Sequence, residues 1–460
     1  MSSIDADERL DPALVRMITA VLLGGILGIL NSTMVATGTD VLAADFRASL
    51  STIGWATTGF LLAVTVAIPF TTWAVDRFGG RRMWLSGLAV FLAGSLAAGC
   101  AWDVGSLIAA RVVQGLGAGI LDPLVLTLLA RAAGPARAGR VMGLMGVVLS
   151  LGPVLGPVAG GAVLDVLPWR WMFLLNVPLG LVAVLLALRS VPRDDGPAAV
   201  PAPLDVRGLA LLGPGFAALV LALSRAAEHT AFATASVLVP LVAGVVLLLA
   251  YGGHARRAAA PLIDLRLFAR GGFTASVAVM ALVGLGTFAN LFVLPLYYQQ
   301  VHGHGVLAAG LLVAPVGLGG ALSMPLAGRL SDRIGARVLV RAGAVVALLA
   351  GLAFTWMGPD AGQAWPAVAA FVMGLGLGFV GAPTMGSLYR TLPAELVPQG
   401  SSALYMLNQL GASIGVVVVT LILETAGDAM AGFHGVYWFA VGALVVVLAA
   451  SPLLPGKAER

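Results

Sequence analysis

The chain has 460 residues, of which 59% are hydrophobic and only 10% are charged. Soluble domains carry about 25% charged residues, so this composition excludes a soluble protein. The net charge is +5, but the basic residues recur in alternate loops instead of forming one patch, which argues against a nucleic-acid partner. The single cysteine, Cys100, excludes an internal disulfide and a cysteine-based metal cluster, and we expect it to be a small packing residue.

Apolar segments of about 20 residues, the length that crosses a bilayer, recur along the whole chain. The first eleven residues are acidic and lack the basic start of a cleaved signal peptide, so we expect the first helix to be retained. The sequence predicts fourteen transmembrane helices. They lie near 15–39, 52–74, 83–101, 105–130, 140–164, 171–189, 208–226, 232–251, 272–298, 307–329, 338–357, 366–389, 400–425 and 434–453.

Charge distribution predicts how the chain is oriented. Fourteen crossings put both termini on one face. Of the 26 lysines and arginines, Arg47, Arg170 and Arg225 are the ones predicted in loops of the opposite face. Because cytoplasmic loops carry the excess of Lys and Arg, we expect a multi-pass protein of the cytoplasmic membrane with both termini in the cytoplasm.

Two polar stretches behave as linkers, Val191–Asp205 and Tyr251–Arg270, and they bracket the seventh and eighth helices. Within the second linker, Leu262–Phe268 has the pattern of a short amphipathic helix lying at the membrane interface. The predicted organisation is an N-terminal six-helix bundle over 1–190, linkers and inserted helices over 191–270, and a C-terminal six-helix bundle over 271–460.

One loop occurs twice. Asp76–Arg82 follows the second helix and Asp332–Arg337 follows the tenth, at an offset of 256 positions, which also carries residue 15 to the start of the ninth helix. Two homologous halves place a cavity between them near the midplane. Gly permits the tight turn, while Asp can accept backbone N–H groups or pair with Arg, so we interpret the loop as a latch that holds one face closed; an ordinary basic loop is the alternative. The predicted latch residues are Asp76, Arg77, Gly79, Arg81, Arg82, Asp332, Arg333, Gly335 and Arg337.

Several motifs of this sequence resemble those of a known family. Asp76–Arg82 is similar to the signature loop of the major facilitator superfamily, and Arg111–Gly115 to its Arg-x-x-Gln-Gly motif. Gly152–Gly161 resembles the Gly-Pro segment of its antiporters, and Trp169–Pro178 resembles a run found in the fourteen-helix drug:proton antiporters of the EmrB/QacA type. The resemblance implies an all-α membrane protein with the major facilitator fold, made of two six-helix bundles plus two inserted helices.

The Gly-Pro segment also has a reading of its own. Gly152, Gly156 and Gly160 recur every four residues and form a smooth stripe for close helix packing, and two prolines permit a bend. The resemblance implies an antiporter hinge that governs the direction of exchange; plain close packing is the alternative. The hinge residues are Gly152, Pro153, Gly156, Pro157, Gly160 and Gly161.

Two ionisable residues lie well inside the membrane, Arg111 and Asp122, both on the fourth helix. Burying either one costs at least about 2.5–3.5 kcal/mol, so such residues usually face a cavity or a partner. Eleven residues separate them, so they stand about 16 Å apart and cannot pair directly. Burial favours the neutral form of a carboxyl, which makes Asp122 the leading proton-coupling site; a structural carboxyl beside Pro123 is the alternative.

The first helix departs from the family pattern. The family has an acid in a Leu-Asp-x-Thr motif, whereas Leu30–Thr33 carries Asn31, which does not titrate. Asn31 and Arg111 lie at similar depth, so we expect an amide to face a cation. Either Asp122 has taken over proton binding or Arg111 meets an anionic substrate group. Asp40 is a possible substitute partner but lies at the outer helix end.

Other polar and aromatic residues are candidates for the substrate cavity, although such residues also hold membrane helices together. A metal pair at His302 and His304 lacks a third ligand, so we expect no metal, and Gly-x-Gly runs inside apolar helices do not make a nucleotide site. The cavity candidates are Asn31, Gln114, Trp55, Phe60, Phe288, Asn290, Phe292, Tyr405, Asn408 and Gln409.

The sequence thus predicts a monomeric secondary transporter in the lipid bilayer that exports a hydrophobic drug or antibiotic, either neutral or cationic, by alternating access. Protons and a small-molecule substrate are its partners, and the proton gradient takes the place of a cofactor. Export of an anionic or zwitterionic metabolite is the nearest alternative, and uptake by symport is a further one. A membrane enzyme or receptor would need a catalytic cluster or a soluble domain, and the sequence has neither.

Overall fold

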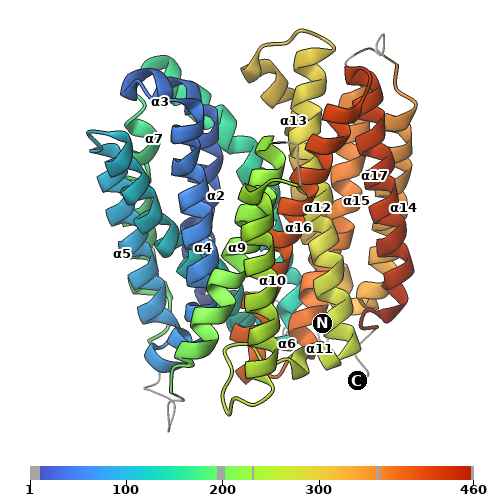
Figure 1. The fold of residues 1–460 in the computed structure, drawn as a ribbon. Coiled ribbons are helices and arrows are strands. Elements are labelled where there is room, and N and C mark those ends of the chain that lie inside the picture. The colour runs from blue at the N-terminus through green and yellow to red at the C-terminus, as the bar shows by residue number, and fades with distance from the viewer. Residues whose placement is uncertain (1–10, 194–202, 230–232, 359–361, 363, 457–460) are drawn as a thin grey trace.

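The fold is known from a computed structural model, which describes residues 11–193, 203–229, 233–358, 362 and 364–456. Within these ranges the regular elements are helices, without strands, and fourteen of them are long and apolar enough to cross a membrane. Two bundles lie side by side, the N-terminal half in blue and the C-terminal half in yellow to red (Figure 1). The predicted all-α membrane architecture with fourteen spans is confirmed.

The N-terminal bundle contains six spans and two short helices. α6 runs over Val104–Val166 as a hairpin of two spans, 104–134 and 137–166, because Gly134 at φ +64° reverses the chain. Asp103 and Ser106 form a capping box at its start, and the hydrogen bonds from the Ser106 backbone and side chain hold the pKa of Asp103 below its usual value. The other helices are α2 (Pro12–Thr37), α3 (Thr39–Phe46), α4 (Leu50–Phe78), α5 (Gly80–Gly99), α7 (Trp171–Leu174) and α8 (Asn176–Ser190).

The C-terminal bundle repeats this plan. Its helices are α12 (Gly271–Gln300), α13 (Val306–Ile334), α14 (Ala336–Thr355), α15 (Ala364–Thr391), α16 (Val397–Thr425) and α17 (Ala429–Ala450), with short 3₁₀ turns at η1 (Ala394–Leu396) and η2 (Ser451–Leu453). α4 and α13 each have 29 residues, and α5 and α14 each have 20. Each pair is joined by one glycine, Gly79 at φ +90° and Gly335 at φ +86°. These matched turns need a residue without Cβ, so the repeat extends to the backbone.

Two predictions about small features are wrong. Over the predicted amphipathic segment, the helix is limited to α11 (Arg266–Ala269), and Leu262 and Ile263 are buried. The Tyr251 hydroxyl donates to the Ile263 carbonyl at 2.9 Å and accepts from its N–H at 2.8 Å, so this stretch packs into the protein. Cys100 is exposed at the end of α5 and is not a packing residue.

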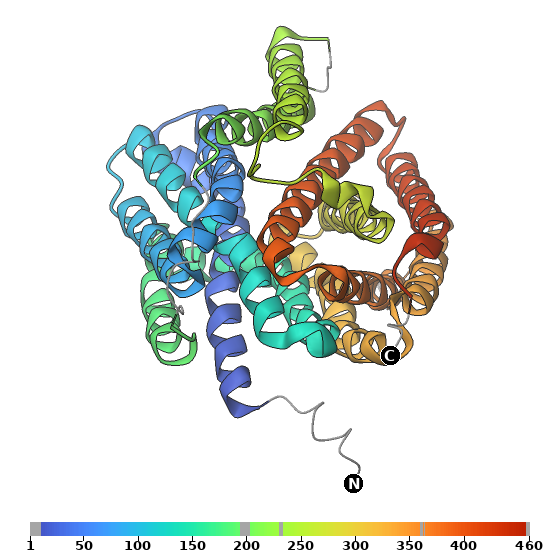
Figure 2. The same ribbon diagram turned by 90° about the horizontal axis from the view of Figure 1, so that it is seen from below.

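The inserted pair, α9 (Val206–His229) and α10 (Ala235–Ala255), lies outside the two bundles at the seam between them (Figure 2). α9 packs against both α4 and α16, one helix from each half. Gly213 allows this approach, because a Cβ there would come within 3.2 Å of the Val66 carbonyl oxygen. Near the other end of α9, Arg225 lies 5.0 Å from the Trp55 ring. The inserted pair therefore covers one seam between the halves.

The glycine stripe of α6 lies directly against α2. A Cβ on Gly152 would meet Ile29 at 2.6 Å, and one on Gly156 would come within 3.2 Å of the Leu30 carbonyl oxygen and overlap Thr33. Pro153 and Pro157 sit in helical backbone of the same span. Close packing of the two helices is therefore present, while the role of the segment in exchange direction stays a prediction.

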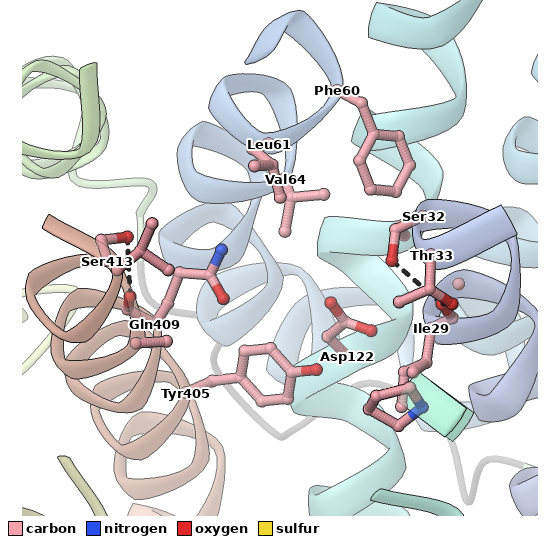
Figure 3. Close-up of a pocket in the computed structure, with 15 residues that line it drawn as sticks. Ile29, Ser32, Thr33, Phe60, Leu61, Val64, Asp122, Tyr405, Gln409 and Ser413 are labelled. Carbon is pink, nitrogen blue, oxygen red and sulfur yellow. Dashed lines mark hydrogen bonds between the residues drawn. The ribbon is translucent and has the colours of Figure 1, made fainter. Parts of the chain in front are cut away.

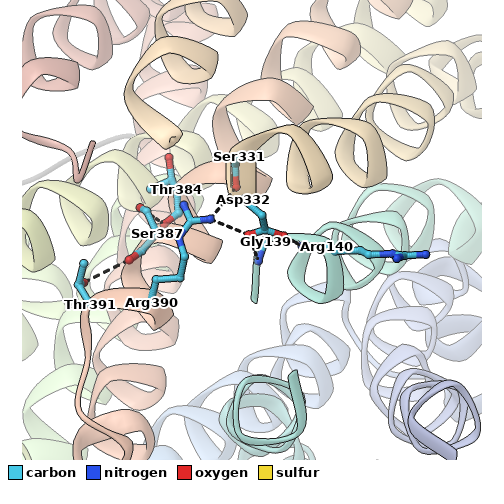
Figure 4. Close-up of polar contacts among 8 residues, drawn as sticks. All are labelled: Gly139, Arg140, Ser331, Asp332, Thr384, Ser387, Arg390 and Thr391. Carbon is cyan, nitrogen blue, oxygen red and sulfur yellow. Dashed lines mark hydrogen bonds and ion pairs between the residues drawn. The ribbon is translucent and has the colours of Figure 1, made fainter. Parts of the chain in front are cut away.

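The two halves are joined by polar contacts at one face, which we call the arginine-rich face because the loops at Gly79 and Gly335 lie there. Asp332, at the end of α13, reaches the N-terminal end of the second span of α6 (Figure 4). Its carboxylate accepts the N–H groups of Gly139 and Arg140, each at 3.0 Å, and pairs with Arg390 at 2.6 Å. Unpaired N–H groups at a helix start attract an anion, so Asp332 of one half caps a helix of the other.

The equivalent N-terminal carboxylate behaves differently. Asp76 pairs with Arg131 of its own half at 3.3 Å, and both side chains are more than one third exposed. The seam between α4 and α16 is joined instead by a hydrogen bond of 2.7 Å between the buried hydroxyls of Thr72 and Ser402. Asp332 therefore makes a contact between the halves, whereas Asp76 makes its described contact within one half, and the role of these residues as a latch stays a prediction.

We expect Asp332→Asn to open the arginine-rich face. Hydrogen bonds to a charged group contribute about 1.5–3 kcal/mol, so losing the charge should raise the population of the open state about tenfold or more. The measurement is the labelling rate of Ser387→Cys by a membrane-impermeant maleimide in a Cys100→Ser background, because Ser387 is buried beside Asp332 and its hydroxyl bonds within its own helix (Figure 4). Asp76→Asn is the matched control and should change the rate little; equal rates for native and Asp332→Asn protein would contradict the latch.

Candidate functional site

A cavity of about 230 Å³ lies between α2, α4, both spans of α6, and α16 (Figure 3). Four helical segments come from the N-terminal half and one helix from the C-terminal half. The cavity therefore lies between the two halves. Its lining residues are Gly28, Ile29, Ser32, Thr33, Phe60, Leu61, Val64, Ala118, Asp122, Pro153, Tyr405, Gln409, Ala412, Ser413 and Val416.

Asp122 carries the one formal charge among these lining residues. Its carboxyl oxygen Oδ1 would lie 3.8 Å from a Cβ on Gly28, so α2 approaches it closely. The Tyr405 hydroxyl, from the other half, is directed at this carboxyl and is placed to donate to it (Figure 3). A carboxylate facing a mostly apolar cavity attracts cations and protons, so Asp122 is the centre of its electrostatics.

The neutral polar groups around Asp122 are mostly engaged with their own helices. Ser32 and Thr33 donate to the carbonyl of Ile29 at 3.0 and 2.9 Å, and Ser413 donates to the carbonyl of Gln409 at 3.0 Å. The side-chain amide of Gln409 lines the cavity (Figure 3). A ligand would therefore meet a carboxylate, an amide and a largely apolar wall.

Arg111 lies outside this cavity and is fully buried. Its Nη1 donates to Asn31 Oδ1 at 2.5 Å and to Gln114 Oε1 at 2.6 Å, and its Nε donates to the Ala56 carbonyl at 3.1 Å. The guanidinium carbon lies 4.1 Å from the centre of the Phe60 ring. Phe60 also lines the cavity, so this ring stands between the cation and the cavity.

The amides around Arg111 continue into a network. Asn31 Nδ2 donates to the Met172 carbonyl at 3.2 Å, and Gln114 Nε2 donates to Ser95 Oγ at 2.6 Å. Side-chain amides can accept from a cation while donating elsewhere, which suits them to a buried arginine without a carboxylate. The network ties α2, α4, α5 and α6 together, so its geometry is that of a structural hub in the N-terminal bundle.

The remaining cavity candidates are dispersed. Asn408 donates to the Met280 carbonyl at 2.7 Å, and Asn290 accepts from the Tyr437 hydroxyl at 2.9 Å, both inside the C-terminal bundle. Trp55 contacts α9, and Phe292 is exposed. The side chain of Phe288 falls outside the described residues. Of the candidates, Phe60, Tyr405 and Gln409 line the cavity together with Asp122.

Sequence reasoning missed the small and apolar residues of the wall. On α16, Ala412, Ser413 and Val416 lie on the same helical face as Tyr405 and Gln409, at spacings of three and four residues. This spacing was available from the sequence, because residues three and four apart share a face. Small and apolar side chains carry no chemical feature that distinguishes a cavity wall from ordinary helix packing.

The histidines at the outer end of α12 form an aromatic cluster. His302 Nε2 lies 3.0 Å from the Tyr297 hydroxyl, and the rings of His302 and His304 are 6.2 Å apart. Among the residues that the structure describes, no group of three His, Cys, Asp or Glu residues is placed to hold a metal ion.

Comparisons with known proteins agree with this architecture. The chain is 36% identical over 421 residues to the multidrug resistance protein B homolog of Mycobacterium tuberculosis, covering 90% of this chain and 77% of that one. It is 30% identical over 414 residues to the multidrug export protein EmrB of Escherichia coli, covering 88% and 80%.

Solved structures share the fold. The human organic anion transporter MFSD10 has a TM-score of 0.65 at 17% identity, covering 94% of this chain and all of that one. The proton:xylose symporter XylE has the same TM-score at 14% identity, covering 95% and 94%. The family model of the Major Facilitator Superfamily matches residues 21–416. The chain therefore belongs to the major facilitator superfamily and is a multi-pass membrane transporter similar to the EmrB-type multidrug exporters.

Proposed function

We propose that this transporter exports hydrophobic cations in exchange for protons. The observation that carries the proposal is the lone carboxylate of Asp122 in a largely apolar cavity between the two halves. A carboxylate in such a site can hold either a proton or a substrate cation, and competition between the two is the simplest basis for exchange. No cofactor is needed, since the proton gradient supplies the free energy.

The cavity favours a cation over an anion. Arg111, the one cation predicted inside the membrane, is enclosed by three acceptors and lies behind the Phe60 ring. An anionic substrate would have to displace those contacts, whereas a cation meets Asp122 directly. Export of an anionic metabolite through Arg111 is therefore the weaker candidate.

Alternating access is supported by contacts at the arginine-rich face, where Asp332 and the Thr72–Ser402 pair join the halves. Drug-sized ligands usually occupy about 300–1,000 Å³, more than the 230 Å³ found here, so a larger substrate would have to widen the cavity. We assign the arginine-rich face to the cytoplasm by its excess of arginine. On that assignment both termini are cytoplasmic and the structure is closed towards the cytoplasm.

Export is favoured over uptake by two observations. The relatives with substantial sequence identity are named for multidrug resistance and export. The Gly152–Gly160 stripe, which resembles the antiporter segment, packs closely against α2 beside the cavity. The xylose symporter shares the fold at 14% identity and so carries no argument about direction. We propose that the transporter works as a monomer, because the cavity described lies within one chain.

Asp122→Asn should abolish export driven by a proton gradient, because the amide cannot exchange a proton for a cation. The protein should still insert and bind neutral hydrophobic ligands. The measurement is substrate-induced proton movement in proteoliposomes across a panel of cationic, neutral and anionic compounds. We expect a loss of at least about a hundredfold in coupled transport, corresponding to a lost charge–charge interaction of about 3 kcal/mol.

Asp40→Asn is the matched control, since Asp40 is an exposed carboxylate in the first turn of α3 and should leave coupling unchanged. Coupled transport by Asp122→Asn protein at the native rate would remove Asp122 from the mechanism. A native protein that moves protons with anions but not with cations would favour the rival substrate class.

Arg111→Lys should destabilise the transporter without changing its charge preference. Lysine keeps the charge but cannot match the planar fork of bonds to Asn31, Gln114 and the Ala56 carbonyl. Loss of one or two bonds to a charged group costs about 1.5–3 kcal/mol each, which should lower the thermal unfolding midpoint in detergent. Unchanged stability together with altered anion transport would instead assign Arg111 to substrate binding.

A further inference from the structure

Asp122 and Tyr405 face each other from opposite halves of the transporter, and the Tyr405 hydroxyl is placed to donate a hydrogen bond to the carboxyl across the seam (Figure 3). Asp122 lies on the first span of α6, and Tyr405 lies on α16. Both line the cavity, so the bond stands where the halves must separate for access from the other side (Figure 3). A bond between them therefore connects Asp122, the group proposed to exchange protons, directly to the C-terminal half.

Other ionisable groups lie away from this pair. α2 contributes Ser32 and Thr33 to the cavity wall, and α4 contributes apolar side chains, so neither presents a titratable group to Asp122. Arg111 lies about three helical turns before Asp122 on the same span. Asp332 and Arg390, from helices that also pack against α6, are engaged with each other at the arginine-rich face. The Tyr405 hydroxyl is therefore the group that responds first to a change of charge on Asp122.

We propose that Tyr405 is a positioning residue that ties α16 to α6 while Asp122 is charged, and releases it when a proton or a substrate cation neutralises the carboxylate. The inference rests on the proposed function, because it assigns the conformational consequence of the exchange at Asp122. It adds a residue of the C-terminal half to a coupling site that otherwise belongs to the N-terminal half.

The physical basis is the strength of a charge-assisted hydrogen bond. A phenol that donates to a carboxylate makes a bond about twice as strong as one that donates to a neutral carboxyl. The pair faces a largely apolar cavity, where such a bond is stronger than in water, so neutralising Asp122 weakens a link between the halves. A bound cation competes for the same carboxylate oxygens. Either event lowers the free energy needed to move α16 away from α6.

A movement of α16 at Tyr405 also acts on a contact at the arginine-rich face. Ser402, which bonds to Thr72 across the seam, lies three residues before Tyr405 on α16, about one turn away. A movement of α16 that breaks the Tyr405 contact therefore acts on the neighbouring Ser402 contact. α16 thus carries two inter-half links of different kinds, of which the Tyr405 link responds to charge.

The experiment measures the distance between the halves as a function of pH. Spin labels are placed at Trp102→Cys and Trp356→Cys in a Cys100→Ser background, because these tryptophans are both 81% exposed and lie on different halves. Distance distributions are recorded by pulsed electron spin resonance in lipid nanodiscs between about pH 5 and pH 8. In the native protein we expect two populations, one with a short and one with a long distance between the labels. Their ratio should change about tenfold over this pH range, within the range usual for coupled sites.

Tyr405→Phe should reduce that change to less than about twofold, and Asp122→Asn should do the same. The double variant should add nothing further, because each single change removes the same link. Tyr389→Phe is the matched control: its hydroxyl is 3.0 Å from Ser401 Oγ on α16, and that partner carries no charge. It should keep the native pH response.

A native pH response in Tyr405→Phe protein, or none in the native protein, would overturn the tether. The proposed function is tested separately by substrate-induced proton movement in proteoliposomes. Absence of that movement, with a pH response that Tyr405→Phe removes, would reject the export function and keep the tether. Intact proton movement with an unchanged response in Tyr405→Phe would reject the tether alone.

Discussion

The bilayer interior cannot solvate a charge, and this constraint shapes the structure around its two deepest ionisable residues. Arg111 meets the constraint by complete enclosure: two amides and a carbonyl accept from its Nη1 and Nε, and an aromatic ring covers its face, while no described residue accepts from its buried Nη2. Asp122 meets it by facing a cavity and a tyrosyl hydroxyl. The first solution fixes a charge permanently, and the second leaves a charge that can be removed. Only the second is suited to exchange.

The contacts that join the halves at the arginine-rich face also satisfy polar groups that would otherwise be buried without partners. Asp332 uses the free N–H groups at a helix start, which need an acceptor in any case, to join the two halves. The opposite seam uses a pair of hydroxyls, and the inserted helix α9 lies over that seam. The two seams therefore differ in chemistry although the chain that forms them is repeated. A motion that opens both need not meet equal resistance at each.

Much of the fold was predictable because hydrophobic length and turn chemistry act locally. The fourteen spans followed from apolar runs, and the repeat followed from two Asp-Arg-x-Gly loops whose glycines adopt the same positive φ. The site was less predictable, because it depends on which helices meet. The sequence indicated that Asn31 and Arg111 lie at one depth, but not that Phe60 screens them from the cavity. It could not indicate that Asp332 crosses to the other half while Asp76 does not, since both occupy identical motifs. The helix predicted over Leu262–Phe268 was too long, because Leu262 and Leu267 are buried by the protein and not by lipid.

The cavity draws its wall from α2, α4, α6 and α16, and no lining residue belongs to α13 or α15. Those two helices instead carry Asp332 and Arg390, which hold the closed face together. The two duplicated halves therefore differ in their proposed roles: the N-terminal half supplies most of the proposed recognition surface, and the C-terminal half supplies the Asp332–Arg390 pair. On the proposed function, substitutions in the cavity-lining parts of α2 and α4 can alter the range of accepted compounds without touching Asp332 or Arg390, which gives this architecture room to change its cargo while keeping its mechanics.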